Sequence, residues 1–143
     1  MSADLREGAN GSPEPRLLAN KTFLVVEDEA LIAMNVESWL QDAGAARVEM
    51  VHRLSSARAA LDKSDLFDAA IVDFRLADGD ASLLIGWLHD RNIPVVVTTG
   101  DPLALREHEG GTVTLLEKPY SEKAFIDSIA TLLSNAKRVA SRG

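Results

Sequence analysis

The chain of 143 residues has the length and composition of a single folded domain, since 46% of its residues are hydrophobic and 26% are charged. It contains no cysteine, which excludes disulfide scaffolds, thiolate-bound zinc, iron–sulfur clusters and thiol nucleophiles. Its formal charge of −7 argues against a nucleic-acid-binding module, and no apolar run is long enough to cross a bilayer, so we expect a cytoplasmic protein without nucleic-acid or membrane partners.

The first twenty residues contain glycine and proline but no hydrophobic periodicity, which predicts a flexible N-terminal leader over residues 1–20. The folded domain is then expected over residues 21–137, followed by a C-terminal tail over residues 138–143. Short apolar runs rich in β-branched residues recur within the domain and predict strands. These runs are residues 23–26, 48–51, 69–72, 95–97 and 113–116.

The segments between these runs have the spacing of amphipathic helices. In the first segment, Ile32, Val36 and Leu40 recur at helical intervals, and Gly44 ends the stripe. Further helices are predicted to begin near Ser55, near Asp80, at Pro102 behind an Asp101 cap, and at Ser121. The helix at Pro102 is expected to be short and weakly anchored, because few apolar residues follow it before Gly110.

Strands that alternate with helices favour an α/β fold with a parallel sheet. The runs 48–51 and 113–116 contain polar positions that are typical of sheet edges, whereas the other runs are nearly all apolar, as strands covered on both faces should be. We therefore predict a single flavodoxin-like (βα)5 domain, with a five-stranded parallel sheet of order 2-1-3-4-5 and helices on both faces.

Acidic, hydroxyl and ammonium side chains stand where the predicted strands end. Glu27 and Asp28 follow the first strand, Asp73 the third, Thr99 the fourth and Lys118 the fifth. Because the carboxyl ends of parallel strands meet at one edge of a sheet, these groups should lie together. Crowding raises the pKa of at least one carboxyl group unless a cation neutralises the cluster. Oxygen ligands of this kind favour Mg²⁺, and an Mg²⁺ site beside an aspartate is a setting for phosphoryl transfer to that carboxylate.

The arrangement resembles the receiver domain of two-component response regulators, over roughly residues 21–136. Any one of the motifs that support the resemblance is weak, but all of them stand in the expected order on the expected elements. The motifs are Val25-Val26-Glu27-Asp28-Glu29, Ile71-Val72-Asp73, Thr99-Gly100 and Glu117-Lys118-Pro119.

The resemblance implies a role for each of these residues. Asp73 would be the phosphoacceptor, with Thr99 and Lys118 contacting the phosphoryl group. Mg²⁺ would be the cofactor, and the Lys118–Pro119 peptide bond would be cis. The implied metal ligands are Glu27, Asp28, Asp73 and the backbone carbonyl of Arg75.

Two positions depart from the common receiver pattern. Many receivers have an aromatic residue three positions before the lysine, where this chain has Leu115, and alanine often stands where this chain has Gly100. The stretch 93–100 is similar to the FAT GUY receivers of alphaproteobacteria, which lack the aromatic switch. In this partial match Val97 and Thr98 replace phenylalanine and alanine. Receivers of that kind are often stand-alone proteins served by kinases of the HWE or a related class.

The function implied is that of a stand-alone response regulator, which takes a phosphoryl group from a sensor histidine kinase or a histidine phosphotransfer protein. It would signal through contact with a downstream protein, and would not be an enzyme beyond slow self-dephosphorylation. Two alternatives within this class stay open, a phosphate sink for a kinase and a receiver-like scaffold that is never phosphorylated. The cognate kinase, the target and the oligomeric state do not follow from the sequence.

Two alternatives from other classes fit less well. A phosphohydrolase of the haloacid dehalogenase type wants an aspartate two positions after the nucleophile, where this chain has Arg75. A nucleotide- or flavin-binding module wants a glycine- or hydroxyl-rich loop after the first strand, where residues 27–29 are acidic. His52, His89 and His108 show no ligand spacing and receive no functional role.

Overall fold

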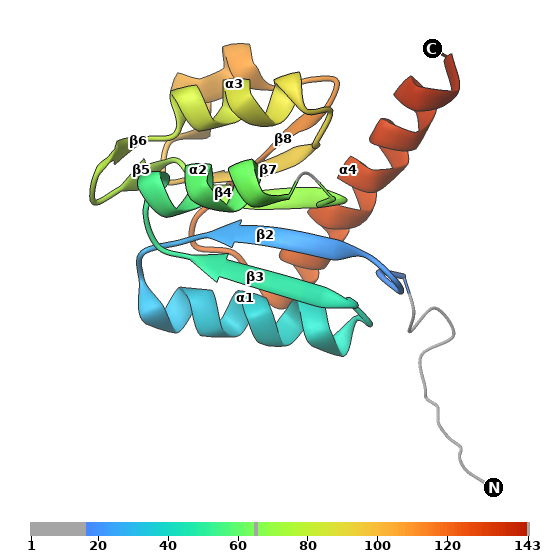
Figure 1. Cartoon of the computed structure of the whole chain (residues 1–143), viewed down its shortest axis with the longest axis horizontal. Helices are drawn as coiled ribbons and strands as arrows, with labels where there is room; N and C mark the ends of the chain where they lie inside the picture. Colours follow the sequence, from blue (N-terminus) through green and yellow to red (C-terminus); the bar gives the residue numbers. More distant parts are fainter. Residues whose placement is uncertain (1–16, 65, 143) are drawn as a thin grey trace, which may run out of the picture.

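The computed structural model describes residues 17–64 and 66–142, and it confirms the predicted α/β fold (Figure 1). The central sheet has the strand order β3-β2-β4-β7-β8, and all neighbouring strands in it are parallel. When the five strands of this sheet are numbered 1 to 5 along the chain, their order is 2-1-3-4-5, as predicted. The strands are β2 (Thr22–Val26), β3 (Arg47–Val51), β4 (Ala69–Asp73), β7 (Val95–Thr99) and β8 (Val113–Glu117).

Helices cover both faces of the sheet. Side chains alternate along each strand, so β2 sends Leu24 and Val26 to one face and Phe23 and Val25 to the other. The first face packs against α2 (Leu54–Lys63) and α3 (Ser82–Asp90), and the second against α1 (Ala30–Asp42) and α4 (Glu122–Arg142). Figure 1 shows the two helical layers on opposite sides of the strands.

The polarity of the strands matches their places in the sheet. Every residue of β4 and β7 is buried, because these central strands have a neighbour on each side and helices above and below. No residue of β3 or β8 is fully buried, and both lie at the edges, as predicted. A short antiparallel pair, β5 (Arg75–Leu76) and β6 (Gly79–Asp80), follows β4 on the way to α3.

The fourth helical segment is a 3-10 helix, η1 (Pro102–His108), where the sequence predicted a helix of the ordinary kind. The predicted cap is present, since the Asp101 carboxylate accepts a hydrogen bond of 3.3 Å from the Ala104 amide. Leu105 is the one buried residue of this segment, so little packing supports a longer helix. Gly110 and Gly111 end it with positive φ angles of 125° and 56°.

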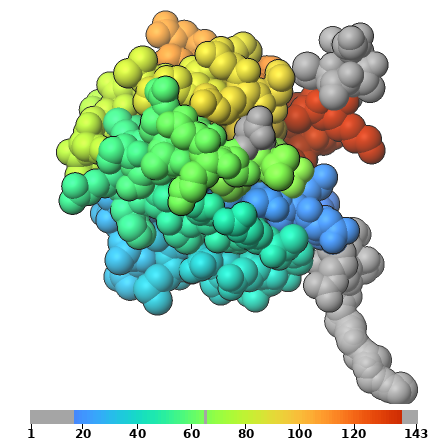
Figure 2. All heavy atoms as spheres, in the orientation of Figure 1, coloured from blue at the N-terminus to red at the C-terminus, as the bar shows by residue number. Residues whose placement is uncertain are grey.

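The folded region differs from the predicted boundaries at both ends. Leu18, expected in the leader, is fully buried with Phe23 in the core, and its amide donates to the carbonyl of Ala43. At the other end α4 continues to Arg142, because no proline or glycine interrupts residues 122–142. Figure 1 shows the last turns of α4 extending beyond the sheet, and Figure 2 shows the segments of α2 and α3 side by side on the surface in the same orientation. Residues 1–16 of the predicted leader lie outside the described residues.

The N-terminus of α2 is capped by a residue distant in sequence. Arg53 stands at the cap position without a side-chain cap, and Asp78, from the turn between β5 and β6, takes over this role. Its carboxylate accepts hydrogen bonds from the amides of Leu54 (2.9 Å) and Ser55 (3.2 Å). These amides hold the pKa of Asp78 below its ordinary value. The turn after β4 is thereby tied to the start of α2.

We expect Asp78→Ala to lower the melting temperature by a few degrees, because two amides at the start of α2 lose their acceptor. Asp78→Asn retains one oxygen acceptor, so its melting temperature should lie between those of Asp78→Ala and the wild type. Thermal unfolding followed by circular dichroism measures the effect. Equal melting temperatures for Asp78→Ala and the wild type would show that the bonds do not stabilise the fold.

Candidate functional site

A cavity of about 550 Å³ opens at the carboxyl edge of the sheet. It lies where the sequence predicted a site, because the central strands all end at this edge. Of the predicted site residues, Asp28, Asp73, Arg75, Thr99 and Lys118 line the cavity, while Glu27 lies beneath it, buried with 3% of its surface exposed.

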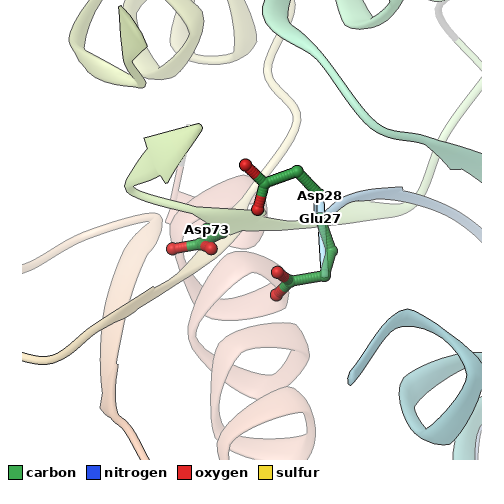
Figure 3. A group of neighbouring side chains, drawn as sticks. All are labelled: Glu27, Asp28 and Asp73. Atoms are coloured by element: carbon green, nitrogen blue, oxygen red, sulfur yellow. The ribbon is translucent and has the colours of Figure 1, made fainter. Parts of the chain in front are cut away.

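Three carboxylates converge beside this cavity (Figure 3). Glu27 and Asp28 come from the end of β2, and Asp73 is the last residue of β4, the neighbouring strand. One oxygen from each lies within 4.8 Å of the others. Glu27 and Asp73 are buried and Asp28 is exposed, so the group opens toward solvent on one side. An open set of carboxylate oxygens fits Mg²⁺, which keeps some of its water ligands.

Lys118 brings a positive charge to the acidic group. Its Nζ donates a hydrogen bond of 2.9 Å to Oδ2 of Asp73 and lies 3.9 Å from Oε1 of Glu27. Burial alone would lower the pKa of Lys118, but the hydrogen bond and the charges of Asp73 and Glu27 outweigh burial and raise it. The ammonium group therefore stays charged at neutral pH. The Lys118–Pro119 peptide bond is cis, as the resemblance implied.

Glu27 has the most perturbed carboxyl group of the site. Burial raises its pKa from 4.5 to about 7, and the charge of Asp73 adds to this effect. The amide of Glu29, which donates to Oε2 of Glu27 at 3.1 Å, and the charge of Lys118 oppose the rise. The expectation that one carboxyl pKa would be raised is confirmed, with desolvation rather than crowding as the largest cause.

In the absence of metal, the free energy of unfolding should fall as the pH rises from about 4.5 to about 7, and the stabilising contribution of Glu27 should be lost above that range. In this interval the unfolded chain has released the proton of Glu27 while the folded protein retains it. A difference of one bound proton corresponds to at most about 1.4 kcal/mol per pH unit. Urea unfolding of the metal-free protein across this range measures the slope.

Glu27→Gln should flatten the pH dependence in this interval, because glutamine keeps the shape of the side chain and does not ionise. Lys118 stays charged throughout, so it contributes no slope there. An unchanged slope in Glu27→Gln would assign the effect to another group.

Thr99 and Arg75 line the same cavity as Asp73. The Thr99 hydroxyl accepts a hydrogen bond of 3.0 Å from the Asp101 amide, so its own proton is available for another acceptor. The Arg75 amide donates to Oδ1 of Asp73 at 3.3 Å, and the Arg75 residue is exposed. The role of its backbone carbonyl as a metal ligand stays a prediction. A Cβ at Gly100 would have no atom within 4 Å, so this departure from the common pattern is not forced by space.

Two residues beside the site were not identified from the sequence. His52, which follows β3, hydrogen-bonds through Nδ1 to the backbone carbonyl of Glu27 at 2.9 Å. The sequence does place His52 directly after a predicted strand, at the edge where the site lies. It was given no role because the three histidines lack the spacing of metal ligands. Tyr120 lies close enough to Glu27 and Asp73 that burial and their charges raise its pKa. With Trp39 and Lys118 it lines a second cavity of about 360 Å³.

Comparison with known proteins agrees with this geometry. The family described as the response regulator receiver domain matches residues 23–130. The C4-dicarboxylate transport transcriptional regulatory protein DctD of Pseudomonas aeruginosa is 28% identical over 129 residues, which are 85% of this chain and 27% of that protein. The chain therefore spans about a quarter of the length of this relative. Among the described residues, no helix is both long and apolar enough to cross a membrane.

The solved structures of two other proteins share this fold. A response regulator receiver protein from Sinorhizobium medicae is 25% identical with a TM-score of 0.75, and the match covers 82% of this chain and 97% of that one. SdrG from Sphingomonas melonis is 30% identical with a TM-score of 0.68, over 80% of this chain and 97% of that one. With a sheet of the same topology and an acidic group at its carboxyl edge, the chain belongs to the response regulator receiver domain family of two-component signalling.

Proposed function

We propose that this protein is a phosphoacceptor that takes a phosphoryl group on Asp73 and passes the signal on through contact with another protein. The observation that carries the proposal is the 2.9 Å bond from Lys118 to Asp73, beside two further carboxylates within 4.8 Å. A nucleophilic carboxylate thus has both a cation and oxygen ligands for a metal close beside it. The proposed donor is a sensor histidine kinase, of the HWE or a related class, or a histidine phosphotransfer protein.

The groups around Asp73 suit an in-line transfer. One carboxylate oxygen of Asp73 forms a bond to phosphorus while the bond from phosphorus to the donor's imidazole nitrogen breaks, and the released nitrogen takes up a proton. Lys118 then pairs with a phosphoryl oxygen, and the free proton of Thr99 is donated to another. Mg²⁺ bound to Glu27, Asp28 and Asp73 would neutralise charge on the phosphoryl oxygens. No substrate is turned over, and slow hydrolysis of the aspartyl phosphate is the only proposed enzymatic step.

Output is proposed to arise at η1 and β8. The 3-10 helix η1 is anchored through Leu105 and is followed by two glycines with positive φ, so a second arrangement costs little packing. Phe74, next to Asp73, is buried and lies 6.5 Å from the His108 ring of η1, measured between ring centroids. This contact supports the proposal that a change at Asp73 reaches η1 through Phe74, without the aromatic residue that many receivers have at the position of Leu115.

Phosphotransfer from the host's complete set of histidine kinases and phosphotransfer proteins tests the proposal. We expect one donor to label the protein far faster than the others, and labelling should require Mg²⁺. A phosphate sink would drain that donor without acquiring a binding partner, whereas a signalling protein would bind a target only when phosphorylated. Failure of every donor to label the protein would support the unphosphorylated scaffold and contradict the proposal.

A further inference from the structure

The backbone of Glu27 is held from β3 by two consecutive hydrogen bonds. Val26, the last residue of β2, pairs with Val51, the last residue of β3. One step further on, the Glu27 amide donates to the Val51 carbonyl at 3.1 Å. The Glu27 carbonyl then accepts a bond of 2.9 Å from Nδ1 of His52. The pairing of the two strands thus extends beyond the sheet by one backbone bond and one side-chain bond.

His52 supplies a bond that the backbone does not make. In a parallel ladder the next donor to the Glu27 carbonyl would be the Arg53 amide. That backbone bond is not among those made within the described residues; Arg53 is the cap residue of α2, with extended angles of φ −144° and ψ 160°. A carbonyl oxygen only accepts, so Nδ1 of His52 carries the proton whether the ring is neutral or charged.

The orientation of this carbonyl affects the acidic group directly. It belongs to the peptide unit that joins Glu27 to Asp28, and both side chains contribute an oxygen to the group of three carboxylates (Figure 3). Glu27 is also held at its side chain, where Oε2 accepts from the Glu29 amide at 3.1 Å. Asp28 is exposed, and the plane of the peptide that precedes it helps to set the direction in which its Cα–Cβ bond leaves the backbone.

The two-residue connection that carries His52 is itself fixed at its far end. Asp78 accepts hydrogen bonds from the amides of Leu54 and Ser55, directly after this connection. Asp78 belongs to the turn that follows Asp73 and β5. The connection between β3 and α2 therefore joins the loop that holds Glu27 and Asp28 to the loop that follows Asp73. An imidazole on such a support can hold a peptide plane with little freedom.

We propose that His52 is a positioning residue for the metal site: its Nδ1–H holds the Glu27–Asp28 peptide plane so that both carboxylates are oriented for a divalent cation before it binds. This inference rests on the proposed function of the acidic group. Hydrogen-bond partners that orient metal ligands typically change metal affinity by about 10- to 100-fold when they are removed. Within the described residues, the hydrogen bond of the His52 ring goes to the backbone carbonyl of Glu27 and not to a carboxylate oxygen of Glu27, Asp28 or Asp73.

The test compares His52→Ala with His52→Asn. Asparagine places an amide N–H close to the position of Nδ1, so it should restore the bond to the Glu27 carbonyl. We expect His52→Ala to bind Mg²⁺ about tenfold more weakly than the wild type, measured by calorimetry with the metal alone, and His52→Asn to recover most of the affinity. His89→Ala, which removes an exposed histidine from α3, is the matched control and should bind like the wild type.

A second readout uses the metal-free protein. Hydrogen exchange at the Glu29 amide, which donates to the Glu27 side chain, should be faster in His52→Ala and close to the wild-type rate in His52→Asn. Wild-type affinity in His52→Ala, or an equal loss in both variants, would overturn the positioning role alone. Absence of Mg²⁺ binding by the wild type would overturn the proposed function and this inference with it.

Discussion

Asp73→Asn is expected to accept no phosphoryl group, whereas the wild type incubated with acetyl phosphate and Mg²⁺ should gain a single mass increment of about 80 Da. The amide of asparagine is not a nucleophile toward phosphorus, so the loss should be complete. The variant should still fold, because asparagine has nearly the same shape and its amide oxygen can accept one of the two hydrogen bonds that Asp73 receives, from Lys118 at Oδ2 or from the Arg75 amide at Oδ1. Intact-protein mass spectrometry measures both proteins directly.

Asp101→Asn is the matched control for this experiment. Asp101 lines the same cavity as Asp73, but its carboxylate caps η1, a role that asparagine can also fill. This variant should therefore gain the same 80 Da, about one phosphoryl group per chain. Labelling of Asp73→Asn to the wild-type extent would place the phosphoryl group on another residue and remove the central assignment.

Asp28→Ala is expected to lose most of the thermal stabilisation by Mg²⁺. A cation that binds only the folded protein stabilises it by about 2.7 kcal/mol at a concentration one hundred times its Kd, which is on the order of 8 °C in Tm for a domain of this size. Asp28 contributes one of the three converging carboxylates and faces solvent, where an ion enters. Removing it leaves two buried carboxylates, of which Asp73 is already bonded to Lys118.

Glu29→Ala tests whether a loss of the Mg²⁺ stabilisation in Asp28→Ala comes from removing a metal ligand or only from removing a negative charge near the site. Glu29 also lines the cavity and carries the same charge as Asp28, but it does not belong to the group of three carboxylates. It should keep most of the Mg²⁺ increment, and a chelator should abolish the increment in the wild type. Equal losses in the two variants, or an unchanged increment in Asp28→Ala, would contradict the assignment of Asp28 as a ligand.

The features that could be predicted from the sequence depend on local patterns. Apolar runs such as 69–72 are long enough only for strands, and their lack of polar positions places them in the centre of a sheet. The carboxyl ends of parallel strands share an edge, so Asp73 and Asp28 could be placed together without coordinates. The structure does bring their oxygens within 4.8 Å of each other.

The predictions that differed from the structure involve residues whose surroundings come from distant segments. Residues 102–108 have a typical helix cap, but the 3-10 form reflects how few of them find a core to pack against. Leu18 follows a stretch without periodicity, and its burial comes from the core cluster that it joins, whose other members lie on distant strands and helices. No local pattern distinguishes these cases from the alternatives.

The order of hydrophobic and polar residues along the chain was therefore sufficient to determine the fold class, the strand order and the residues gathered at the carboxyl edge. Only the tertiary structure decided how these groups act on one another. It showed that burial raises the pKa of Glu27 to about 7, that Lys118 bonds to Asp73, and that His52 holds the Glu27 carbonyl. Desolvation and hydrogen bonding depend on distances and burial in three dimensions, which the spacing of residues along a sequence does not specify.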